Sequence, residues 1–139
     1  MDFGENGMTV NAPRLGCGAA ILKDDAILLV QRLREPESGC WGLPGGKIDW
    51  LEPVENAVVR EVQEELGITL SHLKLLCVVD QIDQFKGEHW VAPVYVTSHF
   101  DGAPELIEPD KHAAFGWFAL HDLPKQLTVA TYKAVEALS

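Results

Sequence analysis

The sequence of 139 residues carries 21 acidic and 11 basic side chains, which give a formal net charge of −10 at neutral pH. A chain of this length is typical of a single domain that can bury a core without disulfides or structural metals. Its acidic charge disfavours partners such as DNA or RNA, and its apolar runs are too short to span a bilayer.

The ends of the chain and its cysteines suggest an intracellular setting. The first residues lack the basic and apolar segments of a secretory signal, so we expect residues 1–11 to be a flexible tail and residues 12–139 to form the domain. Cys17, Cys40 and Cys77 are odd in number and form no close pair, which favours a reduced cytoplasm.

The first half of the domain has the pattern of short strands. Residues 16–22 and 26–31 are apolar and flank an Asp-rich turn, which predicts a β-hairpin. A polar loop follows at 33–39. Residues 40–43 could form a short strand, which we expect Pro44-Gly45-Gly46 to end.

The clearest helix is predicted at residues 53–66. Proline suits the first turn, where its missing N–H has no intrahelical partner, and Gly67 stands where a left-handed C-cap is expected. One apolar stripe recurs every four residues: Val54, Val58, Val62 and Leu66.

Further strands are predicted at 73–81, 90–100 and 115–120, and a terminal helix at 127–138. The order of strands, helix, strands and helix indicates an α/β domain whose mixed sheet has helices on its faces.

The central helix carries a cluster of acids beside its apolar stripe. Glu61, Glu64 and Glu65 stand at i, i+3 and i+4, so they share one side of the helix. They repel one another and crowd the C-terminal half, where the helix dipole disfavours anions. A solvated acidic face is one interpretation. A divalent cation bound by oxygen ligands would resolve the conflict, and Mg²⁺ or Mn²⁺ suits such a site.

The residues around this cluster match a known motif. The pattern GX5EX7REUXEEXGU, with U aliphatic, is met at every defined position: Gly46, Glu52, Arg60, Glu61, Val62, Glu64, Glu65, Gly67 and Ile68. The chain therefore resembles the Nudix hydrolases, and GGKI followed by AVVREVQEELGIT looks most like the MutT-type nucleoside triphosphate pyrophosphohydrolases. The LPGG lead-in and the later Trp117-Phe118 and Leu123-Pro124 add a weaker likeness.

The resemblance implies a fold, a cofactor and site residues. The fold would be an α/β/α sandwich with a mixed sheet, in a single domain. Mg²⁺, with Mn²⁺ as an alternative, would bind the Gly46 carbonyl and the three clustered glutamates. Arg60 would orient those carboxylates, and Glu52 would support them. The expected catalytic residues are thus Glu52, Arg60, Glu61 and Glu64.

The general base is expected among the acids. Glu61 is the first choice, because a carboxylate near the metal can accept the proton of the attacking water. The family also uses a base or an extra ligand from a loop outside the motif. Glu108, expected as a further metal ligand, Asp110 and Glu88 are the candidates.

Substrate contacts are expected from cations and aromatic rings near the motif. Lys47 and Arg32 could bind phosphate, and Trp50 and Phe85 could stack on a base; each could equally be an ordinary surface residue. Further rings in or beside predicted loops are Trp41, His89 and Trp90.

The resemblance implies a small nucleotide substrate, and neither a nucleic acid polymer nor a membrane is expected as a partner. The chain lacks the SQPWPFPxS segment of the NADH pyrophosphatases. It has Asp83 where ADP-ribose pyrophosphatases often have a proline. It has Gln84-Phe85 near the position where dinucleoside polyphosphate hydrolases tend to have a tyrosine. A nucleoside triphosphate, cut to a monophosphate and pyrophosphate, is the expected substrate. The alternatives are ADP-ribose or a nucleotide sugar, and a catalytically silent sensor. A monomer or a homodimer is expected.

Overall fold

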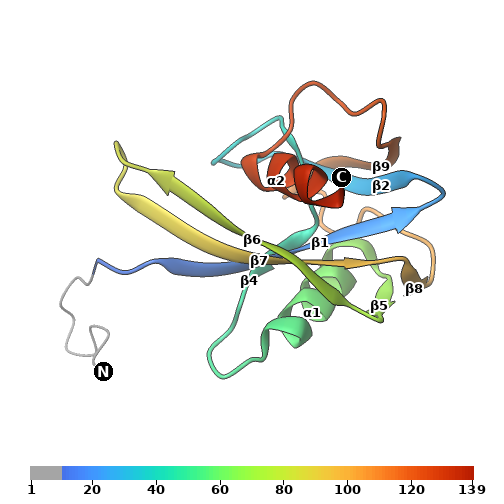
Figure 1. The fold of residues 1–139 in the computed structure, drawn as a ribbon, viewed down its shortest axis with the longest axis horizontal. Helices are drawn as coiled ribbons and strands as arrows, with labels where there is room; N and C mark the ends of the chain where they lie inside the picture. Colours follow the sequence, from blue (N-terminus) through green and yellow to red (C-terminus); the bar gives the residue numbers. More distant parts are fainter. Residues whose placement is uncertain (1–10) are drawn as a thin grey trace.

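The computed structural model describes residues 11–139, so nearly all of the expected N-terminal tail lies outside the described residues. The chain begins with the predicted hairpin, formed by β1 (Arg14–Lys23) and β2 (Ala26–Arg32), which pair antiparallel (Figure 1). Asp24 and Asp25 both adopt positive φ, as a tight two-residue hairpin turn requires.

A mixed sheet of seven strands forms the centre of the molecule. Its main order is β3 (Trp41–Gly42), β2, β1, β7 (Glu88–Thr97) and β6 (Lys74–Asp83). In addition, β4 (Gly45–Lys47) pairs with β1, and β9 (His112–Ala119) pairs with β2. The β1–β7 pair is parallel and the other pairs are antiparallel. A separate two-stranded sheet joins β5 (Thr69–Ser71) to β8 (His99–Asp101).

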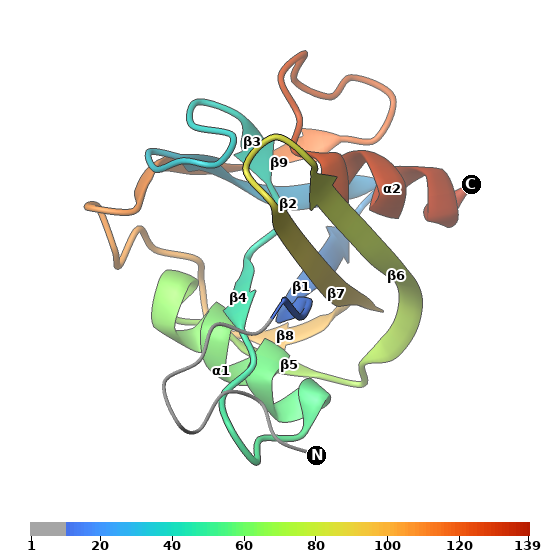
Figure 2. The same ribbon diagram turned by 90° about the vertical axis from the view of Figure 1, so that its left-hand side faces the viewer.

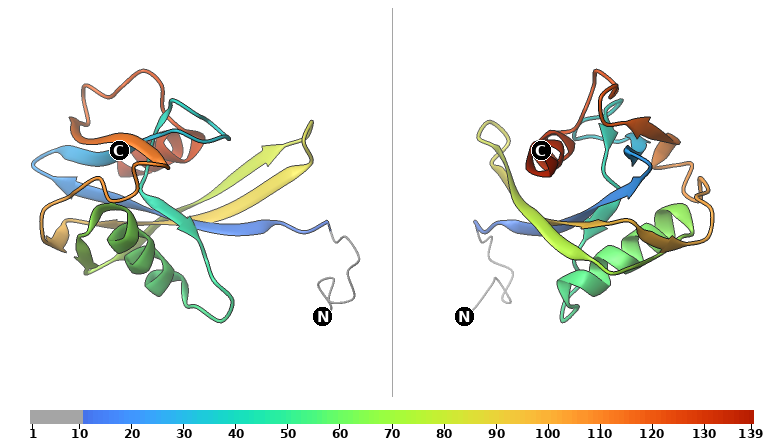
Figure 3. Two further views of the ribbon diagram at one scale, coloured as in Figure 1. Left: turned by 180° about the vertical axis from the view of Figure 1, so that it is seen from behind. Right: turned by 45° about the vertical axis from the view of Figure 1, so that its right-hand side comes forward.

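Two helices cover opposite sides of this sheet, which gives the α/β/α sandwich (Figures 2 and 3). Alternate residues of β1 enter different cores: Ala19 and Ile21 pack with the face of α1 (Val54–Leu66), whereas Ala20 joins the core under α2 (Val129–Leu138). Because both faces are buried, β1 and β2 have continuous apolar runs rather than an alternating pattern.

Helix α1 forms as its periodicity predicts. Val58, Val62 and Leu66 are fully buried, and Val54 packs at the edge of the same core. The helix ends at Gly67, which is left-handed and donates its N–H to the Gln63 carbonyl. The burial of this apolar stripe fixes which side of α1 carries the acids relative to the sheet.

Several predicted boundaries were wrong. The break expected at Pro44-Gly45-Gly46 does end β3, but Gly45 to Lys47 then form β4, since glycine can pair without leaving a hydropathy signal. The strand expected at 90–100 is divided between β7 and β8, and β5 was missed. Helix α2 begins two residues later than predicted, after Thr128, which caps it by accepting from the Thr131 N–H.

Candidate active site

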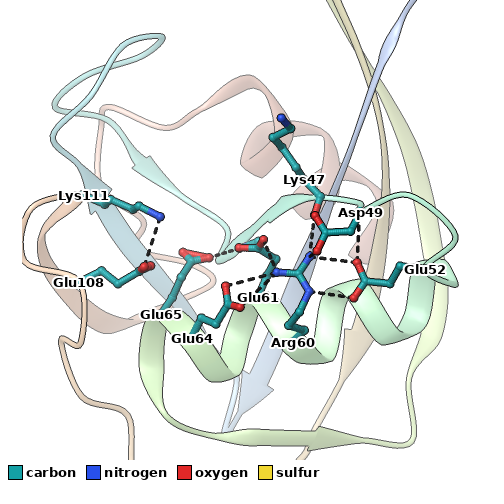
Figure 4. A network of polar contacts seen from close by, with 10 residues as sticks. Lys47, Asp49, Glu52, Arg60, Glu61, Glu64, Glu65, Glu108 and Lys111 are labelled. Atoms are coloured by element: carbon teal, nitrogen blue, oxygen red, sulfur yellow. Dashed lines mark hydrogen bonds and ion pairs between the residues drawn. The ribbon is translucent and has the colours of Figure 1, made fainter. Parts of the chain in front are cut away.

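The acidic cluster lies along one side of α1, facing β4 and the loop before β9 (Figure 4). Its members differ strongly in burial. The side chain of Glu64 is 49% exposed and that of Glu61 16%. Glu65 is only 3% exposed, so the cluster is not a solvated helix face. Burial raises the pKa of Glu61 above its ordinary value, and the Arg60 guanidinium opposes this rise.

Arg60 connects the helix to the loop before it. Its guanidinium donates two hydrogen bonds to Glu52, from Nε at 2.8 Å and from Nη2 at 3.0 Å. This two-bond contact and the Asp49 N–H hold the pKa of Glu52 below its usual range. The same Arg60 Nη2 also donates to the Lys47 carbonyl at 3.0 Å. The 47–52 loop is therefore fixed against α1.

Arg60 also contacts the acids on its own helix. Nη1 donates to Glu61 Oε1 at 2.8 Å and lies 3.3 Å from Glu64 Oε2. A planar guanidinium bonded to three carboxylates reduces their repulsion and fixes their orientation. Arg60 could orient the carboxylates through these contacts, and this role stays a prediction.

Gly46 brings the main chain of β4 against the cluster. A Cβ at this position would collide with the Glu61 carboxylate. Glycine therefore permits the close approach of backbone and carboxylate that a shared metal ion would need. The donors available here are the Gly46 carbonyl and the helix carboxylates, an all-oxygen set that fits Mg²⁺.

Glu65 is held between β4 and β9. Its Oε1 accepts the Gly45 N–H at 2.8 Å, and its Oε2 lies 3.3 Å from Nε2 of His112. Burial raises the pKa of Glu65 to about 8, and the neighbouring Glu61 and Glu108 add to the rise. An uncompensated negative charge is therefore disfavoured at this position.

His112 lies beside this cluster, and the sequence analysis did not select it. It opens β9 and its side chain is 8% exposed. Burial lowers its pKa. Glu108, predicted as a further ligand, lies in the preceding loop, where its Oε2 is 3.2 Å from Lys111 Nζ. Donor atoms of Glu65, Glu108 and His112 all lie within 4.8 Å of one another.

The other proposed bases lie elsewhere. Asp110 forms an exposed ion pair with Arg34 at 3.1 Å. Glu88 opens β7 opposite Asp83, where the β6–β7 hairpin turns. Neither acid belongs to the three-residue group around Glu65.

Two cavities flank β4. One of about 260 Å³ is lined by two of the predicted substrate residues, Arg32 and Lys47, together with Gly46, Glu37, Gln81 and Trp90. A second, of about 610 Å³, is lined by Lys47, Trp50, Arg14 and Trp90. Gly46 borders both the smaller cavity and Glu61.

Of the aromatic residues proposed to contact substrate, some line these cavities and others do not. Trp90 lines both cavities and Trp50, 86% exposed, lines the larger one. Phe85 is fully exposed in the β6–β7 turn and lines neither of these two. Trp41 packs edge-on against Phe118 in the core beneath α2.

Comparison with known proteins identifies the family. The profile of the NUDIX domain matches residues 12–138. The chain belongs to the Nudix family. A crystal structure of a MutT NUDIX hydrolase from Burkholderia pseudomallei superposes with a TM-score of 0.91 at 63% identity, covering 92% of this chain and 99% of that one. The expected sandwich fold of a Nudix protein is thus confirmed.

Other Nudix relatives have named ligands or activities. The ADP-ribose pyrophosphatase of Methanocaldococcus jannaschii is 36% identical over 113 residues, which cover 81% of this chain and 66% of that protein. The Nudix domain of Shewanella oneidensis NrtR, crystallised with ADP ribose, has a TM-score of 0.79 at 25% identity and matches 96% of this chain and 90% of that one. Some curated relatives are longer proteins, and the matched part of this chain spans only 26% and 38% of the length of two of them.

Within residues 11–139, neither helix of this Nudix domain combines the length and hydropathy that a membrane span requires.

Proposed function

We propose that this Nudix protein hydrolyses a phosphoanhydride bond of a nucleoside triphosphate, with a divalent cation, to give a nucleoside monophosphate and pyrophosphate. One observation carries the proposal: Gly46 borders both the helix carboxylates and a cavity of about 260 Å³. The cavity is lined by apolar side chains and a few polar groups, so a nucleobase could enter it. The polyphosphate would then extend from this cavity towards α1.

The chain offers a suitable place for the cation. The Gly46 carbonyl, Glu61 and Glu64 would hold it as oxygen ligands, with Glu65 and Glu108 as further candidates. When bound, Mg²⁺ or Mn²⁺ would neutralise phosphate charge and make a bound water more acidic.

The protein's own side chains would orient the metal ligands and accept a proton from the attacking water. Arg60 holds Glu61 through Oε1, and within the described residues it makes no bond to Oε2. Oε2 of Glu61, which lies beside Gly46, would accept a proton from the attacking water. Burial raises the pKa of this carboxyl, which makes it a stronger base than an exposed glutamate. Glu52 would act indirectly, by holding Arg60.

Substrate binding would use the residues around the smaller cavity. Arg32 and Lys47 would supply positive charge for phosphate in an otherwise acidic protein, and Trp90 would offer a ring to the base. The predicted contact from Phe85 would require movement of its turn.

A turnover screen tests this function directly. Each nucleoside triphosphate, ADP-ribose, dinucleotides and nucleotide sugars are incubated with Mg²⁺ or Mn²⁺, and the products are separated. Glu64→Gln should lower turnover by orders of magnitude, whereas Glu55→Gln, an exposed acid on the same helix, should not. Wild-type turnover of a triphosphate by Glu64→Gln would contradict the site.

ADP-ribose is the second candidate substrate. Two observations favour it: the Methanocaldococcus relative carries that activity in its name, and the larger cavity beyond Lys47 could hold a second sugar moiety. In that case AMP and ribose 5-phosphate are the products, and Trp50→Ala should raise KM for ADP-ribose without changing KM for triphosphates.

A further inference from the structure

Strand β6 has a free outer edge. It is the last strand of the main sheet, and within residues 11–139 its only strand partner is β7 (Figure 2). The outer edge of such a strand presents main-chain N–H and C=O groups with which a further strand can pair. Exposed edge strands are commonly kept short, whereas β6 has ten residues.

One face of β6 is apolar and exposed. Val79 enters the core under α2, so Val78 and Ile82, which lie an odd number of residues away, are on the opposite face of the sheet. Leu75 lies on this face too, because it pairs with Tyr95, which packs against the core of α1. The side chains of Leu75, Val78 and Ile82 are 52%, 56% and 60% exposed. An apolar face beside an unpaired edge indicates a surface that another chain covers.

A β-bulge in β6 determines which residues a symmetric partner strand would meet. The register of β6 against β7 shifts between Leu75 and Cys77, so Leu76 is an extra residue in this strand. In a two-fold antiparallel pairing centred on Val79, Leu76 and Cys77 together would face Gln81 of the partner subunit. The other cross-strand pairs would be Val78 with Asp80, Leu75 with Ile82 and Lys74 with Asp83.

This register is complementary in hydropathy and in charge. The exposed side chains of Leu75 and Ile82 would cover each other. Asp83 stands directly opposite Glu88 across the β6–β7 hairpin, and like charges in that position repel. Lys74 of the partner subunit would bring a positive charge to Asp83, and the two-fold symmetry would repeat this contact. Without the bulge, Leu75 would face Asp83 instead.

We propose that β6 pairs antiparallel with β6 of a second copy of this chain, in the register centred on Val79, so that the two sheets join across a two-fold axis. Main-chain hydrogen bonds along the edge hold the strands together, and the apolar and charged pairs select the register. One strand from each copy makes a small interface, so the association is reversible rather than permanent. The interface goes beyond the proposed function, because it forms without nucleotide or metal.

Sedimentation velocity of the substrate-free full-length protein in EDTA tests the interface. Salt at about 0.15 M screens the repulsion between two acidic chains. The wild type should convert from monomer to dimer as its concentration rises to about 1 mM. Ile82→Lys should raise the Kd of the dimer by about 100-fold or more, since it places a charge against an apolar partner. Leu33→Lys changes an apolar residue of similar exposure, 46%, in the loop after β2, and this matched control should dimerise as the wild type does.

An exchange of charges tests the register itself. Lys74→Asp and Asp83→Lys should each weaken dimerisation by about tenfold or more, because like charges then face each other in both symmetry-related contacts. Mixed in equal amounts, the two variants should form a heterodimer about as tight as the wild-type dimer, since both contacts again join opposite charges.

Three results would overturn the proposal: a wild type that stays monomeric at about 1 mM, a dimer that Ile82→Lys leaves unchanged, or charge variants that associate no better when mixed than alone. Asp83 also accepts the main-chain N–H groups of Phe85 and Lys86 in the hairpin turn. Ile82→Lys decides the matter even if Asp83→Lys does not fold, because the Ile82 side chain is 60% exposed. None of these measurements involves turnover, so they stand whatever the substrate is.

Discussion

Replacing Glu65 by glutamine should stabilise the metal-free protein at alkaline pH. Glu65 is 3% exposed, and burial raises its pKa from 4.5 to about 8. Between these two values the folded protein binds a proton that the unfolded chain releases, so stability falls as pH rises. Glutamine has nearly the same shape and never ionises, so it escapes this loss.

The size of the effect follows from the two pKa values. At about 1.4 kcal/mol for each pH unit, ionising Glu65 costs on the order of 5 kcal/mol once the pH passes the folded pKa of about 8. The difference in free energy of unfolding between Glu65→Gln and the wild type should therefore be small near pH 5. It should grow steadily to its full value near pH 9.

Urea denaturation in EDTA at several pH values measures this difference directly, because other titrating groups are shared by both proteins and cancel. Adding Mg²⁺ or Mn²⁺ at pH 9 should reverse the order, since the wild type binds the ion through Glu65 and the variant lacks that charge. A difference that does not change with pH would refute the reasoning. So would a Glu65→Gln variant that is less stable than the wild type at pH 9 in EDTA.

Three further perturbations probe the rest of the molecule. Arg60→Ala should destabilise the protein by about 2–3 kcal/mol in urea denaturation, because it unpairs several carboxylates at once. Arg34→Ala, which breaks only an exposed ion pair, should cost under about 0.5 kcal/mol. Equal effects of the two variants would contradict a stabilising role for the contacts of Arg60. Gly46→Ala should lower kcat by about 100-fold, since its methyl group displaces the Glu61 carboxylate, and an unchanged kcat would exclude that contact from the working site. Thr128→Ala should lower stability by about 1 kcal/mol through loss of the α2 cap, and a thermal scan without any shift would argue against it.

Local patterns in the sequence predicted the elements whose stability is mostly local. The hairpin of β1 and β2 follows from two apolar runs and an Asp-Asp turn, and α1 from its four-residue stripe and Gly67. Short strands with few apolar residues gave no such signal. Strand β4 is two glycines and a lysine, and β5 and β8 have three residues each, so only their partners define them.

The candidate site could be predicted to a similar extent. The motif placed Glu61, Glu64, Glu65 and Arg60 on one helix, where Arg60 contacts Glu61 and Glu64, and their catalytic roles stay predictions. His112 could not be found, because a single histidine far along the chain shows no ligand spacing. The one clue in the sequence was that His112 lies shortly after Glu108, which the sequence analysis had selected as a metal ligand.

The sequence by itself determined the family, the acidic edge of α1 and the two-faced burial of the central strands, because each depends on side chains a few residues apart. The tertiary structure alone decided that Glu65 is buried between Gly45 and His112, and that two cavities flank Lys47. Burial and electrostatic environment depend on which distant segments pack together. The same glutamate that looks exposed on an isolated helix therefore becomes a buried carboxyl whose pKa is raised to about 8.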